Sequence, residues 1–150
     1  MAVAKSFPPE KCLVKVSQPN ATLPVYQITF AAPPDNRLNT SFCNALFSAL
    51  DYVATLPPGA VITTSEQAKF YSNGLDLQHV HETPGFLQGT LYNLFIRLLT
   101  FPMPTVAAVT GHAFAGGWML AMCHDYRVGN EKKGWFSLNE LEFGGMSVVR

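Results

Sequence analysis

The chain of 150 residues carries ten Lys and Arg residues against ten Asp and Glu residues, so its formal net charge is +0. Because nucleic-acid binding depends on an excess of positive charge, this balance argues against a nucleic-acid partner. Hydrophobic residues form 48% of the chain, which argues against disorder and predicts one globular domain over residues 1–150.

Cysteine usage and apolar patterning exclude further classes. The three cysteines, Cys12, Cys43 and Cys123, are odd in number, far apart and without metal-ligand spacing, which indicates a reducing compartment and no metal site. No apolar run is long enough for a signal-peptide core or a membrane span, so we expect no membrane partner. The terminal residues 148–150 do not form a peroxisomal Ser-Lys-Leu address.

The first half of the chain predicts a hairpin, a helix and a strand. β-Branched residues over 12–16 and 25–30 predict a β-hairpin. Asn39 is suited to cap a helix whose apolar positions recur at helical spacing, namely Phe42, Ala45, Leu46, Ala49, Leu50 and Val53. Residues 57–59, Pro-Pro-Gly, end this helix, and residues 60–64 predict a short buried strand.

The second half predicts alternating loops, helices and strands. Residues 69–77 predict a loop with a tight Asn73-Gly74 turn, and residues 86–100 predict a helix whose inward side chains are Leu87, Leu91, Leu94, Phe95, Leu98 and Leu99. A strand over 105–109, a turn of small residues over 111–117, a helix over 118–123 and a strand over 126–128 follow. This alternation predicts an α/β fold with parallel strands and right-handed crossovers.

Two segments carry the candidate chemistry. Residues 104–117 run from a buried strand through small residues into a helix, whose first N–H groups have no intrahelical acceptor and could stabilise an oxygen that gains negative charge. Close packing of the helix against the strand is the alternative explanation for the small residues. Residues 69–77 follow the strand at 60–64, and ligands gather at the carboxyl ends of parallel strands. Two backbone donors that converge from these loops would form an oxyanion hole.

Residues 70–77 and 104–117 resemble two signature segments of the enoyl-CoA hydratase/isomerase (crotonase) superfamily. The resemblance extends from about Val25 onward and is strongest to the 3,2-enoyl-CoA isomerases of plant and fungal peroxisomes. It implies a crotonase-like fold, a superhelix of repeated β-β-α units, and an acyl-CoA thioester as partner. Coenzyme A would be part of the substrate, with no separate cofactor.

The resemblance also assigns candidate site residues. It places the two oxyanion-hole donors on the backbone N–H groups of Leu75 and Gly116, and further substrate-binding positions on Asn73, Gly74, Asp76 and Gly117. For Asp76, a helix cap is the competing explanation.

The carboxylates separate the possible reactions. Hydratases of this family use two glutamates to manage one water, and the first position is occupied here by Met119, whose thioether cannot transfer protons. The second position is Glu140, and Glu142 does not match it. A single base suffices to move a double bond from position 3 to position 2. We therefore expect a 3-enoyl-CoA to trans-2-enoyl-CoA isomerase of fatty acid β-oxidation with Glu140 as catalytic base; the alternatives are a hydratase and a non-catalytic acyl-CoA-binding family member.

The remaining polar candidates receive structural interpretations. His79 and His81 lack a third metal ligand, and His112 is expected to shape its loop. Arg37 is expected to be solvated, with a phosphate contact as the alternative.

The family domain continues well beyond the length of this chain. We therefore expect the chain to correspond to the N-terminal part of that domain, before the C-terminal helices that cover the acyl site and build trimers. The resemblance implies a homo-oligomer for the full domain. It also implies a peroxisomal location, with the cytoplasm and the mitochondrion as alternatives.

Overall fold

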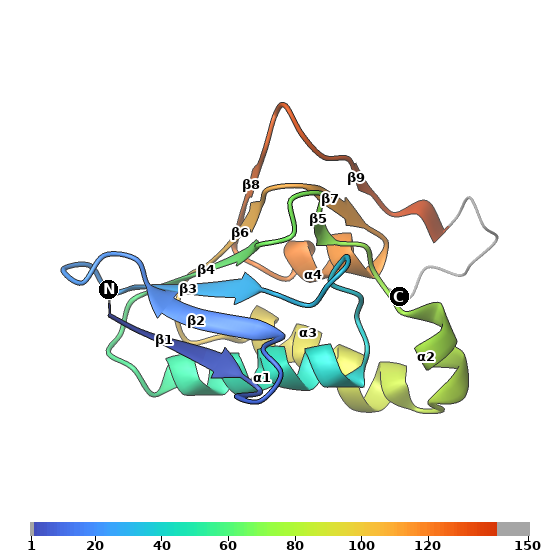
Figure 1. Ribbon diagram of the computed structural model, residues 1–150, viewed down its shortest axis with the longest axis horizontal. Coiled ribbons are helices and arrows are strands. Elements are labelled where there is room, and N and C mark those ends of the chain that lie inside the picture. Colours follow the sequence, from blue (N-terminus) through green and yellow to red (C-terminus); the bar gives the residue numbers. More distant parts are fainter. Residues whose placement is uncertain (1, 141–150) are drawn as a thin grey trace.

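The structure, a computed structural model, describes residues 2–140 and is built around a six-stranded sheet (Figure 1). Its strand order is β1-β2-β3-β4-β6-β8, with bounds Ala2–Phe7, Val14–Gln18, Val25–Phe30, Ala60–Ser65, Thr105–Val109 and Tyr126–Gly129. The strands β1, β2 and β3 pair antiparallel, whereas β3, β4, β6 and β8 pair parallel. The predicted α/β class with parallel strands is confirmed.

A second, three-stranded parallel sheet accompanies the first. It contains β5 (Phe70–Ser72), β7 (His112–Phe114) and β9 (Phe136–Ser137), in the order β5-β7-β9. Each of these strands follows a strand of the large sheet in the chain, so β4-β5, β6-β7 and β8-β9 are successive pairs that add one strand to each sheet. This repetition carries the chain from one sheet to the other.

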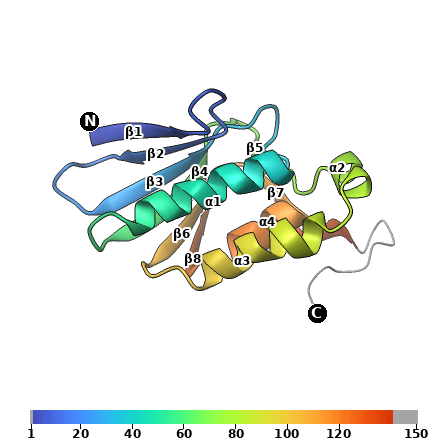
Figure 2. The same ribbon diagram turned by 90° about the horizontal axis from the view of Figure 1, so that it is seen from below.

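Two of the helices cover one face of the large sheet, and a third contacts the small sheet. Helix α1 (Thr40–Ala54) and helix α3 (Tyr92–Leu99) lie side by side (Figure 2). A short π-helical turn, η1 (Leu87–Leu91), leads into α3, while α2 (Leu77–Glu82) follows β5 and α4 (Gly116–Met122) follows β7. Asn39 caps α1 as predicted, because its side-chain oxygen accepts a hydrogen bond from the Phe42 N–H at 3.0 Å.

Several predicted elements differ from the structure. Strand β1 was not predicted, and the segments 69–77 and 111–117 each contain a three-residue strand where a loop or turn was expected. Three residues are too few to display the alternation that marks a strand. Leu99 was predicted to face inward but is 65% exposed, because it follows Leu98 around the helix and leaves the buried side.

The buried core lies between the large sheet and α1 with α3. Every apolar position predicted for the inward face of α1 is buried in this core. Within residues 2–140, no helix combines the length and apolar character needed to span a membrane.

Replacement of Leu98 and Leu99 by alanine tests this division of helix α3. Leu98 is 2% exposed, so Leu98→Ala should lower the free energy of unfolding by about 2–5 kcal/mol. Its neighbour Leu99 is 65% exposed, so Leu99→Ala should change that free energy by less than about 0.5 kcal/mol. Urea denaturation of both variants measures the difference, and equal losses would contradict the placement of α3.

Candidate functional site

The carboxyl ends of β5 and β7 bring two loops together. The two strands pair in parallel, with Phe70 opposite His112. Leu75 follows β5, and Gly116 follows β7 as the first residue of α4. The loops are in contact, since a Cβ atom at Gly74 would lie 3.2 Å from the Gly116 nitrogen. The sequence therefore located two adjacent segments correctly, although the strands that align them belong to the small sheet.

Hydrogen bonds within the protein use most of the N–H groups of the loop after β5. Three of these groups donate internally: Asn73 N–H to the Asp35 carbonyl at 2.9 Å, Gly74 N–H to the Ser72 hydroxyl at 3.2 Å, and Asp76 N–H to the Leu38 carbonyl at 3.1 Å. Within the described part of the chain, the N–H of Leu75 has no such acceptor. The loop thus leaves this one donor available to a ligand.

The start of helix α4 also leaves backbone donors without partners. The N–H of Ala115 donates to the Ser137 carbonyl at 2.8 Å, and the N–H groups of Trp118 and Met119 donate back to the Ala115 carbonyl. Between them, Gly116 and Gly117 donate to no acceptor among residues 2–140. This is the expected state of the first N–H groups of a helix.

Unusual backbone conformations lie at the junction of the two loops. Ala115 has φ 52° and ψ −124°, a region that side chains with a Cβ atom rarely occupy. The bond from Ala115 to β9 helps to hold this turn, which ends β7 and starts α4 at once. A Cβ atom at Gly117 would collide with the Ser72 carbonyl, so close packing also requires small residues here. The close-packing explanation of the small-residue segment is therefore confirmed at Gly117.

The segment 35–38 braces the loop after β5, and the sequence did not reveal this role. The Arg37 guanidinium donates to the carbonyls of Asn73 and Leu75 at 3.3 and 3.0 Å, and to the Asp35 carboxylate at 3.0 Å. The same carboxylate accepts from the Asn73 side chain at 2.8 Å. Arg37 was predicted to be solvated, but in the structure it also binds the backbone on both sides of Gly74.

Asn36 was also missed and connects this brace to the core. It is fully buried with φ 53°, and its side chain donates to the Ser65 hydroxyl at 2.8 Å and to the Tyr71 carbonyl at 2.9 Å. Its carbonyl accepts from the Ser72 hydroxyl at 2.8 Å. An asparagine in a Pro-Asp-Asn sequence is a recognisable candidate for a left-handed turn, so a local signal was present.

A cavity of about 180 Å³ brings together three of the predicted site residues, Asn73, Leu75 and Glu140, whereas Gly74, Asp76, Gly116 and Gly117 do not line it. Its lining consists of Arg37, Asn73, Leu75, Leu77, Phe114, Ala115, Asn139 and Glu140. Both carboxylate oxygens of Glu140 are shielded from solvent and have no hydrogen-bond partner among the described residues. Burial of a carboxylate without a hydrogen-bond partner costs free energy, so the position of Glu140 calls for an explanation.

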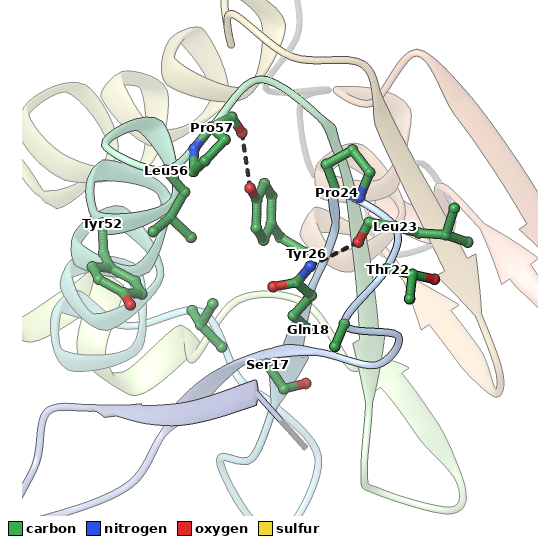
Figure 3. A pocket seen from close by; sticks show the side chains of 11 residues that line it. Ser17, Gln18, Thr22, Leu23, Pro24, Tyr26, Tyr52, Leu56 and Pro57 are labelled. Carbon is green, nitrogen blue, oxygen red and sulfur yellow. Dashed lines mark hydrogen bonds between the residues drawn. The ribbon is translucent and has the colours of Figure 1, made fainter.

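A larger cavity, of about 400 Å³, lies elsewhere (Figure 3). It lies between the hairpin of β2 and β3 and the end of α1, beside the start of β3 rather than its carboxyl end. Two of its polar side chains are already engaged: the Tyr26 hydroxyl donates to the Pro57 carbonyl and the Gln18 amide donates to the Leu23 carbonyl, each at 2.8 Å. We therefore take the smaller cavity as the candidate site, although the cavity of Figure 3 is larger.

The other candidate residues have structural contacts. Asp76 caps α2 by accepting from the His79 N–H at 3.1 Å, which supports the competing explanation given for this residue. His112 accepts from the Trp135 N–H at 3.1 Å and packs on aromatic rings, as expected for a loop-shaping residue. Met119 is 6% exposed. Glu142 lies outside the described residues.

Comparison with known proteins now defines the family. The model of the enoyl-CoA hydratase/isomerase family matches residues 20–149, and the chain belongs to this family. The chain is 36% identical over 113 residues to the peroxisomal enoyl-CoA delta isomerase 1 of Arabidopsis thaliana, covering 72% of the chain and 47% of the relative. It is 29% identical over 147 residues to the mitochondrial enoyl-CoA delta isomerase 1 of Homo sapiens, covering 94% of this chain and 48% of the relative.

Solved structures agree on the fold. A crystal structure of an enoyl-CoA hydratase from Geobacillus kaustophilus superposes with a TM-score of 0.84 at 22% identity, over 98% of this chain and 55% of that one. The predicted crotonase-like fold is confirmed. The chain spans about half the length of the curated relatives it matches.

Replacement of Gly74 and Gly85 by alanine tests the close approach of the two loops. The two glycines share a left-handed conformation, with φ 81° and φ 83°, which costs an alanine about 1–2 kcal/mol. A Cβ atom at Gly74 would lie 2.7 Å from the Phe114 carbonyl, whereas one at Gly85 meets no atom within 4 Å. Gly74→Ala should therefore lower the free energy of unfolding by roughly 1–3 kcal/mol more than Gly85→Ala. Chemical denaturation measures both, and equal losses would refute the close approach.

Proposed function

We propose that this protein binds an acyl-CoA thioester and converts 3-enoyl-CoA to trans-2-enoyl-CoA. The observation that carries the proposal is the cavity in which an unpartnered, shielded Glu140 carboxylate shares a lining with Leu75. The Leu75 N–H and the nearby Gly116 N–H have no acceptor within residues 2–140. A base and two backbone donors are the groups that an enolate-forming reaction requires.

Each group has a defined role in the proposed reaction. The thioester oxygen would accept hydrogen bonds from the Leu75 and Gly116 N–H groups. Glu140 would remove a proton from C2, and the electron pair of the broken C–H bond would move toward the thioester oxygen to form a dienolate. The same glutamic acid would return the proton to C4, while the double bond forms between C2 and C3 and the carbonyl is restored. The donors stabilise the dienolate because its charge is concentrated on the oxygen they face.

The lining of the cavity fits this sequence of steps. Leu75, Leu77 and Phe114 offer apolar surface to an acyl chain beside the Glu140 carboxylate. An apolar lining excludes water that could otherwise exchange with the proton held by the glutamate between its two transfers. The brace by Arg37 and Asp35 would keep the Leu75 N–H in place during both transfers. Asn73, Gly74, Asp76 and Gly117 would contribute by shaping the two loops rather than through side-chain chemistry.

The family also contains hydratases, and one residue separates the two activities here. The position of the first hydratase glutamate is Met119, which is 6% exposed and has no group that transfers protons. Incubation of a 2-enoyl-CoA in ¹⁸O-water would reveal a hydratase by incorporation of label into a 3-hydroxyacyl product. Binding of a thioester without either reaction would favour a non-catalytic acyl-CoA-binding protein.

The setting of the reaction is proposed from the relatives. Their names place one isomerase in the peroxisome and one in the mitochondrion, and we favour the peroxisome and fatty acid β-oxidation because the peroxisomal relative is more similar in sequence. A homo-oligomer of the trimer type is proposed for the whole family domain. Coenzyme A enters as part of the substrate.

Replacement of Glu140 by glutamine tests the base directly. Glu140→Gln preserves the shape of the side chain but removes the base, so kcat for 3-enoyl-CoA should fall by roughly 10²- to 10⁴-fold. Affinity for the thioester should stay within about threefold, since the backbone donors remain. Formation of the conjugated thioester is followed by its absorbance, and binding by calorimetry.

The matched control is Glu131→Gln, an exposed glutamate in the turn between β8 and β9. This variant should keep the activity of the unaltered protein. Undiminished turnover in Glu140→Gln would remove the proposed base, whereas equal losses in both variants would indicate a general effect of the lost charge.

A further inference from the structure

A buried chain of side-chain hydrogen bonds lies behind the candidate site. Tyr71 in β5 and Thr63 in β4 are fully buried, and His124, just after α4, is 4% exposed. The Tyr71 hydroxyl lies 2.8 Å from Thr63 Oγ1, which in turn lies 2.9 Å from His124 Nε2. Nothing in the proposed reaction uses these three groups, although buried polar groups are costly unless they are all satisfied.

The chemistry of the partners fixes the direction of each hydrogen bond. His124 Nδ1 lies 3.0 Å from the Leu120 carbonyl, which can only accept, so Nδ1 carries the hydrogen. Burial lowers the pKa of His124 to about 4, so the ring is neutral at pH 7 and its Nε2 accepts. The single hydroxyl hydrogen of Thr63 therefore goes to Nε2, and Tyr71 donates to Thr63. Every donor in the chain thus has one acceptor.

The two ends of this series of hydrogen bonds lie close in sequence to the two candidate oxyanion donors. Tyr71 lies four residues before Leu75 in the segment that the 35–38 brace holds. Leu120 lies one helical turn after Gly116 in α4. These side-chain hydrogen bonds therefore connect β5 to α4 through Thr63 of the large sheet, independently of the pairing between β5 and β7.

We propose that Tyr71, Thr63 and His124 are positioning residues whose hydrogen-bond chain fixes strand β5 relative to helix α4 and so sets the spacing of the Leu75 and Gly116 N–H groups. The catalytic consequence of this inference rests on the proposed function, but the geometric consequence does not. Two donors must both lie close to 3 Å from one oxygen to stabilise it. Hydrogen bonds are directional and can hold such a spacing more tightly than apolar contacts, which permit sliding.

The test compares two replacements of the central residue. Thr63→Val keeps the shape of the side chain but removes the hydroxyl, which breaks both bonds of the chain. Thr63→Ser keeps the hydroxyl and should restore them. Thr105→Val is the matched control. Thr105 is the first residue of the neighbouring strand β6, is also buried, and its hydroxyl forms a hydrogen bond with the Asp125 carboxylate.

Two measurements separate positioning from general destabilisation. In ¹H–¹⁵N spectra of the folded proteins, the Leu75 and Gly116 amide signals should shift in Thr63→Val but keep their places in Thr63→Ser and Thr105→Val. With 3-enoyl-CoA, kcat should fall by roughly 10- to 100-fold in Thr63→Val while KM changes by less than about threefold. Thr63→Ser should recover most of kcat.

The outcomes distinguish this inference from the proposed function. Unmoved Leu75 and Gly116 signals in folded Thr63→Val overturn the inference, whether or not the protein is active. Shifted signals in a protein without isomerase activity support the positioning role and count against the proposed reaction instead. Should Thr63→Val fail to fold by circular dichroism, Tyr71→Phe removes only the first bond of the chain, and unmoved signals in that folded variant overturn the inference equally.

Discussion

The parallel pairing of β5 with β7 is the constraint on which the candidate site depends. Each strand is only three residues long, yet their alignment places Leu75 beside the first residue of α4. Two donors from distant parts of the chain can act on one oxygen only if their strands end at the same level. The small residues after both strands permit the close approach, and the brace from residues 35–38 holds the first loop from its other side.

The balance of polar groups distinguishes this region from ordinary packing. Around Leu75, neighbouring backbone groups find partners within the protein, and segment 35–38 supplies most of them. In the same cavity, the Glu140 carboxylate is shielded without a partner in the described residues. A carboxylate and backbone donors without partners among residues 2–140 are what the proposed function requires of a site that accepts a polar ligand atom. In the larger cavity of Figure 3, by comparison, the Gln18 and Tyr26 side chains donate to acceptors within the protein.

Membership of the enoyl-CoA hydratase/isomerase family gives these unused groups a chemical context. One fold supports several reactions in such families, so the choice among them depends on which proton-transferring side chains are present. Met119 is buried at the position to which the sequence resemblance assigns the first hydratase glutamate, and this is why an isomerase is proposed. The buried chain from Tyr71 to His124 adds a layer behind the donors, because it ties the segments that carry them to the same residue of β4.

The sequence by itself determined the α/β class, the helix capped by Asn39, and the two segments that carry Leu75 and Gly116. These features rest on local signals: apolar periodicity, a capping residue, and small residues after a buried strand. The other features could not be predicted, because they gave no local signal in the sequence. The strands β5 and β7 are too brief to show alternation, and the exposure of Leu99 depends on which side of α3 meets the core. The roles of Arg37, Asn36 and His124 were decided only by tertiary structure, because each acts through partners far away in the chain. A sequence displays which groups can donate or accept, but only the packed chain decides which of them remain unused.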